Sequence, residues 1–443
     1  MQLVAYGAQD IYLTGNPQIT FFKVVYRRHT NFSMETISQT FDSSVDFGKK
    51  CSVTIARNGD LVNGMILEVK LPELYQTPGT STSVSWVDGI GNSLIKSVEV
   101  EIGGQQIDKH YGEWLDIWGE LNVKKDHRDA YDTMVGNTYA SDDADPADSA
   151  KGHGVTLYVP LRFWFNRNPG LALPLIALQY HEVKINLELE ESAKLVRSDV
   201  AISGVVQMGE SGGSNAALTS CELLVDYIYL DTDERRRFAQ VSHEYLIEQL
   251  QFTGTESLTS GSGNANIDLN FNHPVKQLNW IVQNETYLTT ASGPGTADTK
   301  RRATGNQKLR YSALPNIKGR YDTFQKAKIQ LNGHDRMSER DSDYFRLVQN
   351  VNHSEVSPSK TIYTYSFGLK PSEHQPSGTC NFSRIDNAKL NLTFDTSTGS
   401  ENTDSAGNPY TGQMGSGVEV KVFATNYNVL RIMSGMGGLA YSN

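Results

Sequence analysis

The stretch VEVEIGGQQIDK (Val98–Lys109) and the stretch AKIQLNGHDRMS (Ala327–Ser338) share one pattern at an offset of 229 residues. Each alternates apolar and polar side chains and then places a two-residue turn, Gly103-Gly104 in the first and Asn332-Gly333 in the second. Both dipeptides suit a type I′ hairpin turn, which needs a positive φ at two successive residues. An aromatic-bearing segment follows each hairpin. The sequence therefore predicts the same β-hairpin twice in one chain.

A second block lies before each hairpin. The stretch IARNGDLVNGMILEV (Ile55–Val69) matches LNFNHPVKQLNWIVQ (Leu269–Gln283) at an offset of 214, which sets Ile66 against Trp280. Both stretches predict a strand, a tight turn and a strand, because apolar residues alternate on either side of a polar break.

A third block lies after each hairpin. The alternating stretch Val183–Leu187 (VKINL) matches Ala388–Leu392 (AKLNL) at an offset of 205. Three blocks in the same order indicate a duplicated unit. The offset falls from 229 to 205, so the first copy carries 24 more residues between its second and third blocks. The acidic tract SDDADPADSA (Ser141–Ala150) lies there and is predicted to be a loop insertion.

The two copies predict the fold class. Short strands separated by Gly, Asn, Ser and Thr clusters are typical of a β-sandwich, and a jelly roll suits a unit of about 200 residues. We predict an all-β protein of two consecutive jelly-roll β-sandwiches, a double jelly roll with short helices and long loops. The predicted segments are an N-terminal arm (residues 1–30), a first jelly roll (31–230), a helical linker (231–240) and a second jelly roll (241–443).

The linker has a helix start signal. Asp231 suits an N-cap position, and Glu234 follows three residues later as in a capping box. The three arginines from Arg235 to Arg237 are expected on a solvated or salt-bridged helical face rather than in a nucleic-acid patch. Long loops, which usually make contacts or form a surface, are predicted at Thr77–Asn92, Asp126–Gly154, Ser198–Ser220, Thr253–Asn264, Thr286–Asn316 and Thr396–Gly417.

Composition excludes several function classes. The 443 residues carry a net charge of -10, and an acidic chain gains nothing from neutralising phosphates, so direct nucleic-acid binding is not expected. The three cysteines (Cys51, Cys221 and Cys380) are too few for a disulfide framework and are expected as small buried side chains. No run approaches the roughly 20 apolar residues of a membrane span. The apolar run Ile19–Tyr26 is instead expected as a strand or an extended arm.

Enzymatic motifs are missing from the sequence. His243-Glu244 begins like HExxH, but Ile247 stands where the second histidine should be, so no metal and no cofactor are predicted. An alternative is a sugar-binding or sugar-cleaving β-sandwich, which would need a cleft lined by Trp or Tyr beside carboxylates. The five tryptophans are spread over both halves, mostly at expected core positions. We therefore predict that the protein is not an enzyme.

Five Asn-x-Ser/Thr sequons occur, at Asn31, Asn284, Asn352, Asn381 and Asn391. A sequon permits a glycan only on an exposed segment. Asn381 and Asn391 lie in or beside predicted strands. Asn352 is expected on a long loop, and Asn352 and Asn284 are the candidate glycosylation sites.

The sequence also resembles a known family. The matching stretches are Leu3–Phe32, Asn58–Leu61, Glu101–Tyr111, Pro169–Lys184, His243–Gly254, Gln375–Leu390 and Asn426–Asn443. They cover both halves and both ends, and they resemble the major capsid proteins of nucleocytoplasmic large double-stranded DNA viruses of the algal-virus type.

The resemblance implies two jelly rolls side by side, a homotrimer that forms a pseudo-hexagonal capsomer, and capsomers that tile an icosahedral shell. It implies contacts of the arm with neighbouring capsomers and minor capsid proteins, an inner viral membrane beneath the shell, outer loops that face the host, and assembly in the host cytoplasm. Phe21, Phe22 and Tyr26 are expected to anchor the arm in a groove or at a sheet edge. A minor capsid or vertex protein of the same fold is the alternative.

Overall fold

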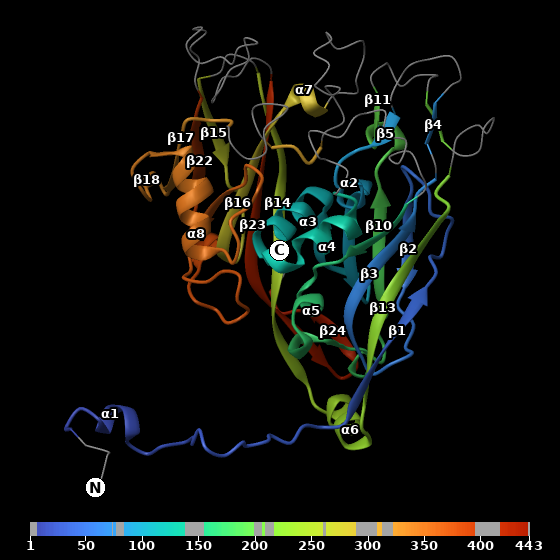
Figure 1. The fold of residues 1–443 in the computed structure, drawn as a ribbon, viewed down its shortest axis with the longest axis vertical. Helices are drawn as coiled ribbons and strands as arrows, with labels where there is room; N and C mark the ends of the chain where they lie inside the picture. The colour runs from blue at the N-terminus through green and yellow to red at the C-terminus, as the bar shows by residue number, and fades with distance from the viewer. Residues whose placement is uncertain are drawn as a thin grey trace.

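The computed structural model describes residues 7–72, 74–76, 84–137, 155–198, 206–208, 217–259, 263–288, 308–311, 322–394 and 417–441. The predicted insertion Ser141–Ala150 and most of the predicted long loops lie outside the described residues. Two β-sandwiches stand side by side with their strands running roughly along the long axis (Figure 1).

The first jelly roll contains two antiparallel sheets. Sheet 1a has the order β1-β13-β3-β8, and sheet 1b has the order β2-β10-β6-β7. The bounds are β1 (Phe32–Gln39), β13 (Ser220–Leu230), β3 (Leu61–Lys70), β8 (Thr156–Pro160), β2 (Lys50–Thr54), β10 (Val183–Leu189), β6 (Ile95–Ile102) and β7 (Gln105–Tyr111). Shorter strands are β9 (Leu173–Pro174) on β3, β11 (Val196–Ser198) on β5 (Val84–Trp86), and β12 (Val206–Met208) on β4 (Leu74–Gln76).

The second jelly roll repeats this arrangement. Sheet 2a has the order β14-β23-β16-β20, and sheet 2b has the order β15-β22-β17-β18. The bounds are β14 (His243–Leu258), β23 (Val418–Met433), β16 (Pro274–Asn284), β20 (Tyr363–Ser366), β15 (Asn264–Asp268), β22 (Ala388–Thr393), β17 (Lys326–Leu331) and β18 (His334–Asp335). Off these paths lie β21 (Cys380–Asn381), β24 (Met436–Leu439) and β19 (Arg340–Asp341).

The strand orders of the two rolls correspond one to one, which confirms the predicted double jelly roll. The two predicted hairpins are β6–β7 and β17–β18. Their turns have positive φ at both central residues, namely 58° and 84° at Gly103-Gly104 and 51° and 78° at Asn332-Gly333. The predicted type I′ turn chemistry is therefore confirmed in both copies.

One detail of the predicted alignment is wrong. Trp280 is fully buried in the core of the second roll, whereas Ile66 points away from the core of the first and is half-buried. Met65 and Leu67 are the core residues of β3 there. Successive strand residues face opposite sides, so an alignment error of one residue exchanges the two faces. Sequence identity alone could not separate neighbouring registers in two apolar strands.

Each roll has its own hydrophobic core between its two sheets. The first core is built from alternate residues of β3, β6, β10 and β13, and the second from alternate residues of β16, β17, β22 and β23. Ile247, Leu430 and Ile432, which belong to the long strands β14 and β23, pack in the first core. The described C-terminal residues form the β23–β24 hairpin, and His181 Nδ1 lies 3.0 Å from the Gly437 carbonyl oxygen. The Gly-rich C-terminal segment is thus packed against the first roll.

The helices are short. Their bounds are α1 (Ile11–Thr14), α2 (Ile90–Leu94), α3 (Gly112–Asn122), α4 (Lys125–Val135), α5 (Trp164–Arg167), α6 (Thr232–Gln240), α7 (Glu285–Leu288) and α8 (Gln349–His353). The π-helix η5 (Tyr344–Val348) continues into α8, and 3-10 turns are η2 (Pro169–Leu171), η3 (Leu175–Ala177), η4 (Ser192–Lys194) and η6 (Phe382–Arg384). No helix in the described part of the chain is long and apolar enough to cross a membrane.

Some segments predicted as loops are regular structure. Residues 126–135 form most of α4, and residues 253–258 extend β14. Helix α4 lacks a clear apolar pattern in the sequence, because Tyr131 and Val135 are the only residues that it buries. The predicted helix after Asp231 is present, and the Asp231 carboxylate accepts a hydrogen bond from the Thr232 backbone N–H at 2.8 Å. Arg235 lies 3.0 Å from Asp60, as expected for a salt-bridged face.

The N-terminal segment leaves the body of the molecule. Residues 15–31 run away from β1 as an extended arm that carries α1 near its far end (Figure 1). The arm starts beside α6, at one end of the long axis. Ile19–Tyr26 is not a strand, which excludes the internal-strand interpretation and leaves the extended arm.

Candidate functional site at the junction of the two jelly rolls

Helix α3 occupies the junction between the two rolls (Figure 1). Its apolar residues Trp114, Ile117, Trp118 and Leu121 follow the spacing i, i+3, i+4 and i+7, which places them on one side of a helix. The helix starts at Gly112 directly after β7. A Cβ atom at Gly112 would lie 2.2 Å from the Asn92 carbonyl oxygen, so only glycine lets the chain turn there.

The apolar side of α3 packs on the second roll. Trp114, Ile117 and Leu121 form a separate buried cluster with Ile281 of β16 and Phe423 of β23. The Trp114 and Phe423 rings are 5.8 Å apart between centroids. Because Ile281 and Phe423 lie on the face of sheet 2a that points away from the second core, α3 covers the outer face of that sheet.

The acidic residues of α3 pair with cations that come mostly from the second roll. Glu113 lies 3.0 Å from Lys421 and 3.7 Å from Lys308. Asp116 accepts hydrogen bonds from Lys360 at 2.7 Å and from the Tyr311 hydroxyl at 2.9 Å.

Glu120 completes the row of acids on α3. Its carboxylate accepts a hydrogen bond from the Ser359 backbone N–H at 2.8 Å and pairs with Arg128 of α4. A buried charge is tolerated only when it is paired and hydrogen-bonded, and these three acids meet that condition. The junction is therefore a fixed, matched surface that holds the two rolls in one orientation.

The pairing sets the charge state of the junction. Burial would raise the pKa of Glu113, but Lys308 and Lys421 outweigh burial and lower its pKa to about 2. Burial raises the pKa of Asp116 although Lys360 opposes it, whereas Lys360 and Arg128 outweigh burial at Glu120 and lower its pKa. Near neutral pH, Glu113 is thus a permanent anion between two lysines.

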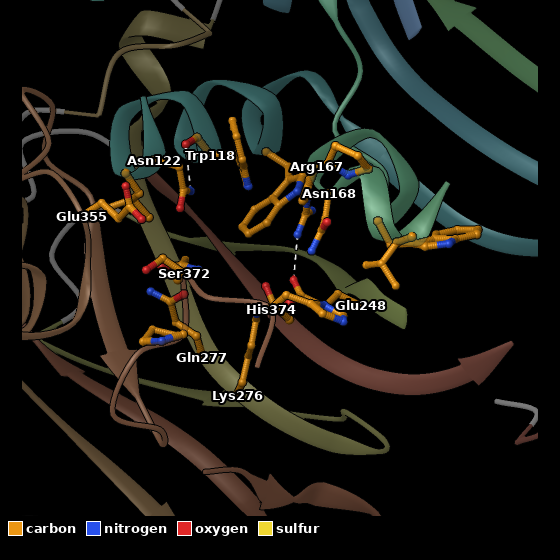
Figure 2. A pocket seen from close by; sticks show the side chains of 18 residues that line it. Trp118, Asn122, Arg167, Asn168, Glu248, Lys276, Gln277, Glu355, Ser372 and His374 are labelled. Carbon is orange, nitrogen blue, oxygen red and sulfur yellow. Dashed lines mark hydrogen bonds and ion pairs between the residues drawn. The ribbon is translucent and has the colours of Figure 1, made fainter. Parts of the chain in front are cut away.

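A cavity of about 350 Å³ opens beside α3 and is lined by both rolls (Figure 2). Glu248 of β14 is its buried carboxylate, and it lies 2.8 Å from Arg167 and 2.6 Å from Lys276. Burial lowers the pKa of Lys276, an effect that Glu248 opposes. Trp118 lines the same cavity, and the Arg162 guanidinium lies 4.4 Å above its ring.

This cavity meets part of the description of a sugar site but not its chemistry. A glycosidase needs one carboxyl group free to donate a proton and a second one to act on the sugar or water. The Glu248 carboxylate is held between two cations, and Arg162 occupies a face of Trp118 on which a sugar ring would stack. The other four tryptophans are at most 5% exposed, as core residues are. The described residues contain no cluster of three or more His, Cys, Asp or Glu side chains that could hold a metal ion.

Comparison with known proteins decides the family. Residues 20–231 match the family model "Major capsid protein N-terminus", and residues 234–438 match "Large eukaryotic DNA virus major capsid protein". The chain belongs to the large eukaryotic DNA virus major capsid proteins.

Relatives in this family match along the whole chain. The major capsid protein of Pyramimonas orientalis virus is 51% identical over all of this chain and 99% of its own length. That of Paramecium bursaria Chlorella virus 1 (PBCV-1) is 45% identical with the same coverage. A quasi-atomic model of the PBCV-1 virus capsid matches 96% of this chain and all of the solved chain, with a TM-score of 0.75 and 41% identity. The protein is therefore a structural component of the virion capsid that packs with neighbouring capsomers, and not an enzyme.

A more distant structure supports the fold alone. The Faustovirus major capsid protein matches 97% of this chain with a TM-score of 0.70 at 12% identity. Two stacked jelly rolls therefore persist where little of the sequence is shared.

The structure places the predicted arm anchors in solvent. Phe21, Phe22 and Tyr26 are 88%, 99% and 86% exposed, and they lie on the extended arm without contact to either core. Large apolar side chains this exposed are unusual in a soluble protein unless they meet a partner.

The candidate glycosylation sites lie in regular structure. Asn352 is exposed, but it lies in helix α8 and not on a long loop, so that part of the prediction is wrong. Asn284 is the last residue of β16 and is half-buried. Asn381 and Asn391 lie in β21 and β22, as predicted. Exposure makes Asn352 the better placed of the two candidates.

The junction itself was missed at the level of sequence. Glu113, Asp116 and Glu120 repeat at helical spacing among four apolar residues, which is a readable signal for a helix buried on two sides. Their partner Lys308 falls in a segment that was predicted to be a loop. Nothing in the local sequence connects that lysine with a helix almost 200 residues earlier.

Proposed function

We propose that three copies of this chain form a homotrimer, a capsomer of near-sixfold outline that tiles the icosahedral shell. The observation that carries the proposal is the repetition of one strand order in two rolls locked side by side by α3. Three such pairs offer six similar sandwiches around a threefold axis. The proposed domains are the first jelly roll at 31–230, the linker at 231–240 and the second jelly roll at 241–443.

The test is the mass of the purified chain by light scattering at several concentrations, followed by negative-stain imaging of the peak. A stable particle of three times 49.1 kDa with a hexagonal outline is expected. A monomer at every concentration would contradict self-association into a capsomer.

We further propose that the arm, residues 1–30, binds neighbouring capsomers or minor capsid proteins. Its support is the exposure of Phe21, Phe22 and Tyr26 and the position of the arm at the α6 end of the molecule. Deletion of residues 1–30 should leave the capsomer intact and abolish its assembly into sheets or shells. Capsomers that still form a lattice without the arm would contradict this role.

The remaining parts of the proposal concern the surroundings of the shell. Assembly takes place in the host cytoplasm, the shell encloses an inner viral membrane, and outer loops face the host. The net charge of -10 supports a shell that makes no direct contact with DNA. Asn352 and Asn284 are the candidate glycan sites in the virion, and peptide mass spectrometry of virion protein tests both in one digest. A glycan on Asn352, which directly follows Val351 on α8, would leave that side of the helix facing solvent, and an unmodified peptide would remove Asn352 from the candidates.

A further inference from the structure

The two rolls carry helical insertions at the same place in their topology. In the first roll β7 pairs with β6 up to Ser97↔Tyr111, and α3 follows at once. In the second roll β19 pairs with the matching end of β17 at Ala327↔Arg340, and η5–α8 (Tyr344–His353) follows. The two insertions are therefore equivalent products of the duplication.

The first of these insertions is covered, and the second is not. Trp114, Ile117 and Leu121 of α3 are at most 4% exposed, because they lie on the outer face of sheet 2a. On η5–α8 the apolar residues Leu347, Val348 and Val351 are 45%, 44% and 68% exposed. Phe345 and Asn350 of the same insertion face inward and are fully buried, so the insertion has a fixed orientation and an uncovered apolar side.

A fourth apolar residue extends this uncovered side. Leu369 is 73% exposed, and its carbonyl oxygen accepts a hydrogen bond from His353 Nδ1 at 3.0 Å, which places it beside the end of α8. We call Leu347, Val348, Val351 and Leu369 the α8 patch.

Sheet 1a offers the surface that corresponds to the covered face of sheet 2a. Leu224 and Ile66 are directly paired on β13 and β3, and their neighbours Leu223, Val225, Met65 and Leu67 all point into the first core. Leu224 and Ile66 therefore point outward, where they are half-buried. Their direct neighbours on the flanking strands are Ser38 of β1, opposite Leu224, and Pro160 of β8, opposite Ile66. Tyr158, opposite Glu68, is 38% exposed, and Met34, opposite Ile228 farther along β1, is 53% exposed. This outer face is apolar at its centre.

We propose that the α8 patch of one copy packs on the outer face of sheet 1a of the next copy. The contact repeats between chains the contact that α3 makes with sheet 2a within a chain. It rests on the proposed trimer and names the surfaces that build it. Helix α8 and strands β1, β3 and β13 lie on opposite sides of the molecule (Figure 1), so the contact joins two different surfaces and can close into a ring.

The surroundings of the two surfaces are charged. Sheet 1a carries the acidic residues Glu68, Glu222 and Asp226 beside its apolar centre, and Lys370, which pairs with Glu373 at 2.8 Å, follows Leu369 at the edge of the α8 patch. Six equivalent contacts would then run around the capsomer, three within chains and three between chains.

The first test places a charge in the patch. Val351→Asp should raise the trimer dissociation constant at least a hundredfold by light scattering, since a buried unpaired carboxylate opposes association. Asn266→Asp is the matched control, because Asn266 is an exposed residue on the outer face of sheet 2b. This control should remain trimeric. Circular dichroism checks that both variants keep the fold of the wild type.

The second test does not depend on the stability of a charged variant. Val351→Cys is combined in turn with Met34→Cys, Leu224→Cys or Tyr158→Cys and oxidised. At least one pair should give covalent dimers and trimers on non-reducing gels, and the single variants should not.

The outcomes separate the two proposals. A wild-type trimer that tolerates Val351→Asp and forms no such cross-link overturns the assignment of the surfaces and leaves the trimer standing. A wild-type monomer overturns the trimer, and the surface assignment with it.

Discussion

Helix α3 and the insertion η5–α8 occupy the same position in the topology of two copies of one jelly roll, and they differ in the surface that they cover. The apolar and acidic sides of α3 are both buried against sheet 2a and its neighbouring lysines. The insertion η5–α8 buries one side in its own roll and leaves Leu347, Val348 and Val351 exposed. The comparison shows that equivalent insertions in a duplicated domain can have different roles. One makes a fixed contact within the chain, and the other leaves an apolar surface available for a second chain.

Removal of Trp114 should break the fixed contact with the largest effect. Trp114 is 3% exposed in the junction cluster, and truncation of a buried tryptophan typically costs about 3–5 kcal/mol. We expect Trp114→Ala to lower the free energy of unfolding in urea by that amount. Val351 is at an exposed position of the equivalent insertion, so Val351→Ala should lower the free energy of unfolding of the monomeric chain by less than about 0.5 kcal/mol. Equal losses in the two variants would remove the distinction between the insertions.

Neutralisation of Glu113 should break the electrostatic part of the same contact. Glu113→Gln removes the anion that Lys421 and Lys308 share, while Lys308 keeps Glu190 at 3.2 Å and Lys421 keeps Glu419 at 3.8 Å. The cost should therefore lie below the roughly 3 kcal/mol of a buried charge left without any partner. We expect a lower midpoint of thermal unfolding at pH 7. The matched control is Glu373→Gln, which removes the exposed pair with Lys370 and should change stability by less than about 1 kcal/mol. A stable Glu113→Gln protein would mean that Lys308 and Lys421 do not depend on this carboxylate.

Acid should weaken the junction in a defined window of pH. The pKa of Glu113 is about 2 in the folded chain, below the roughly 4.3 of an unfolded chain. A carboxyl group whose pKa is lower in the folded chain than in the unfolded chain stabilises the fold at pH values above the unfolded-chain pKa. This stabilisation is lost as the pH falls from about 4.3 towards 2. Asp116 has a raised pKa and contributes in the opposite direction, so the comparison is made between wild type and Glu113→Gln. Their stabilities should converge in this window, and parallel curves would contradict the assignment.

The linker helix should show the smallest effect. Asp231 caps α6 at an exposed position, and replacement of a helix N-cap by alanine costs about 1 kcal/mol. Asp231→Ala should lower the midpoint of thermal unfolding slightly and leave the junction intact. Asp233→Ala, in the first turn of the same helix but not at the cap, is the control. A loss as large as that of Trp114→Ala would mean that α6, and not α3, holds the rolls together.

The local parts of the fold were predictable from the sequence. Turn dipeptides such as Asn332-Gly333 require a particular backbone, and period-two alternation such as Val183–Leu187 requires a strand with one buried face. The duplication then implied the double jelly roll, because two segments with the same strand and turn patterns in the same order are expected to adopt the same fold. The helix after Asp231 followed from its cap.

Other features depended on the tertiary structure, because they join residues that are far apart in the chain. The register that makes Trp280 core and Ile66 outward depends on pairing with distant strands. Lys308 and Lys360 become partners of α3 only when the second roll brings them there. Whether an apolar helix face is covered, as at Trp114, or open, as at Val351, depends on which surface lies opposite. The hydrophobic pattern of the sequence determines that one face of a helix is apolar and stabilised by burial. The tertiary structure determines which surface covers that face.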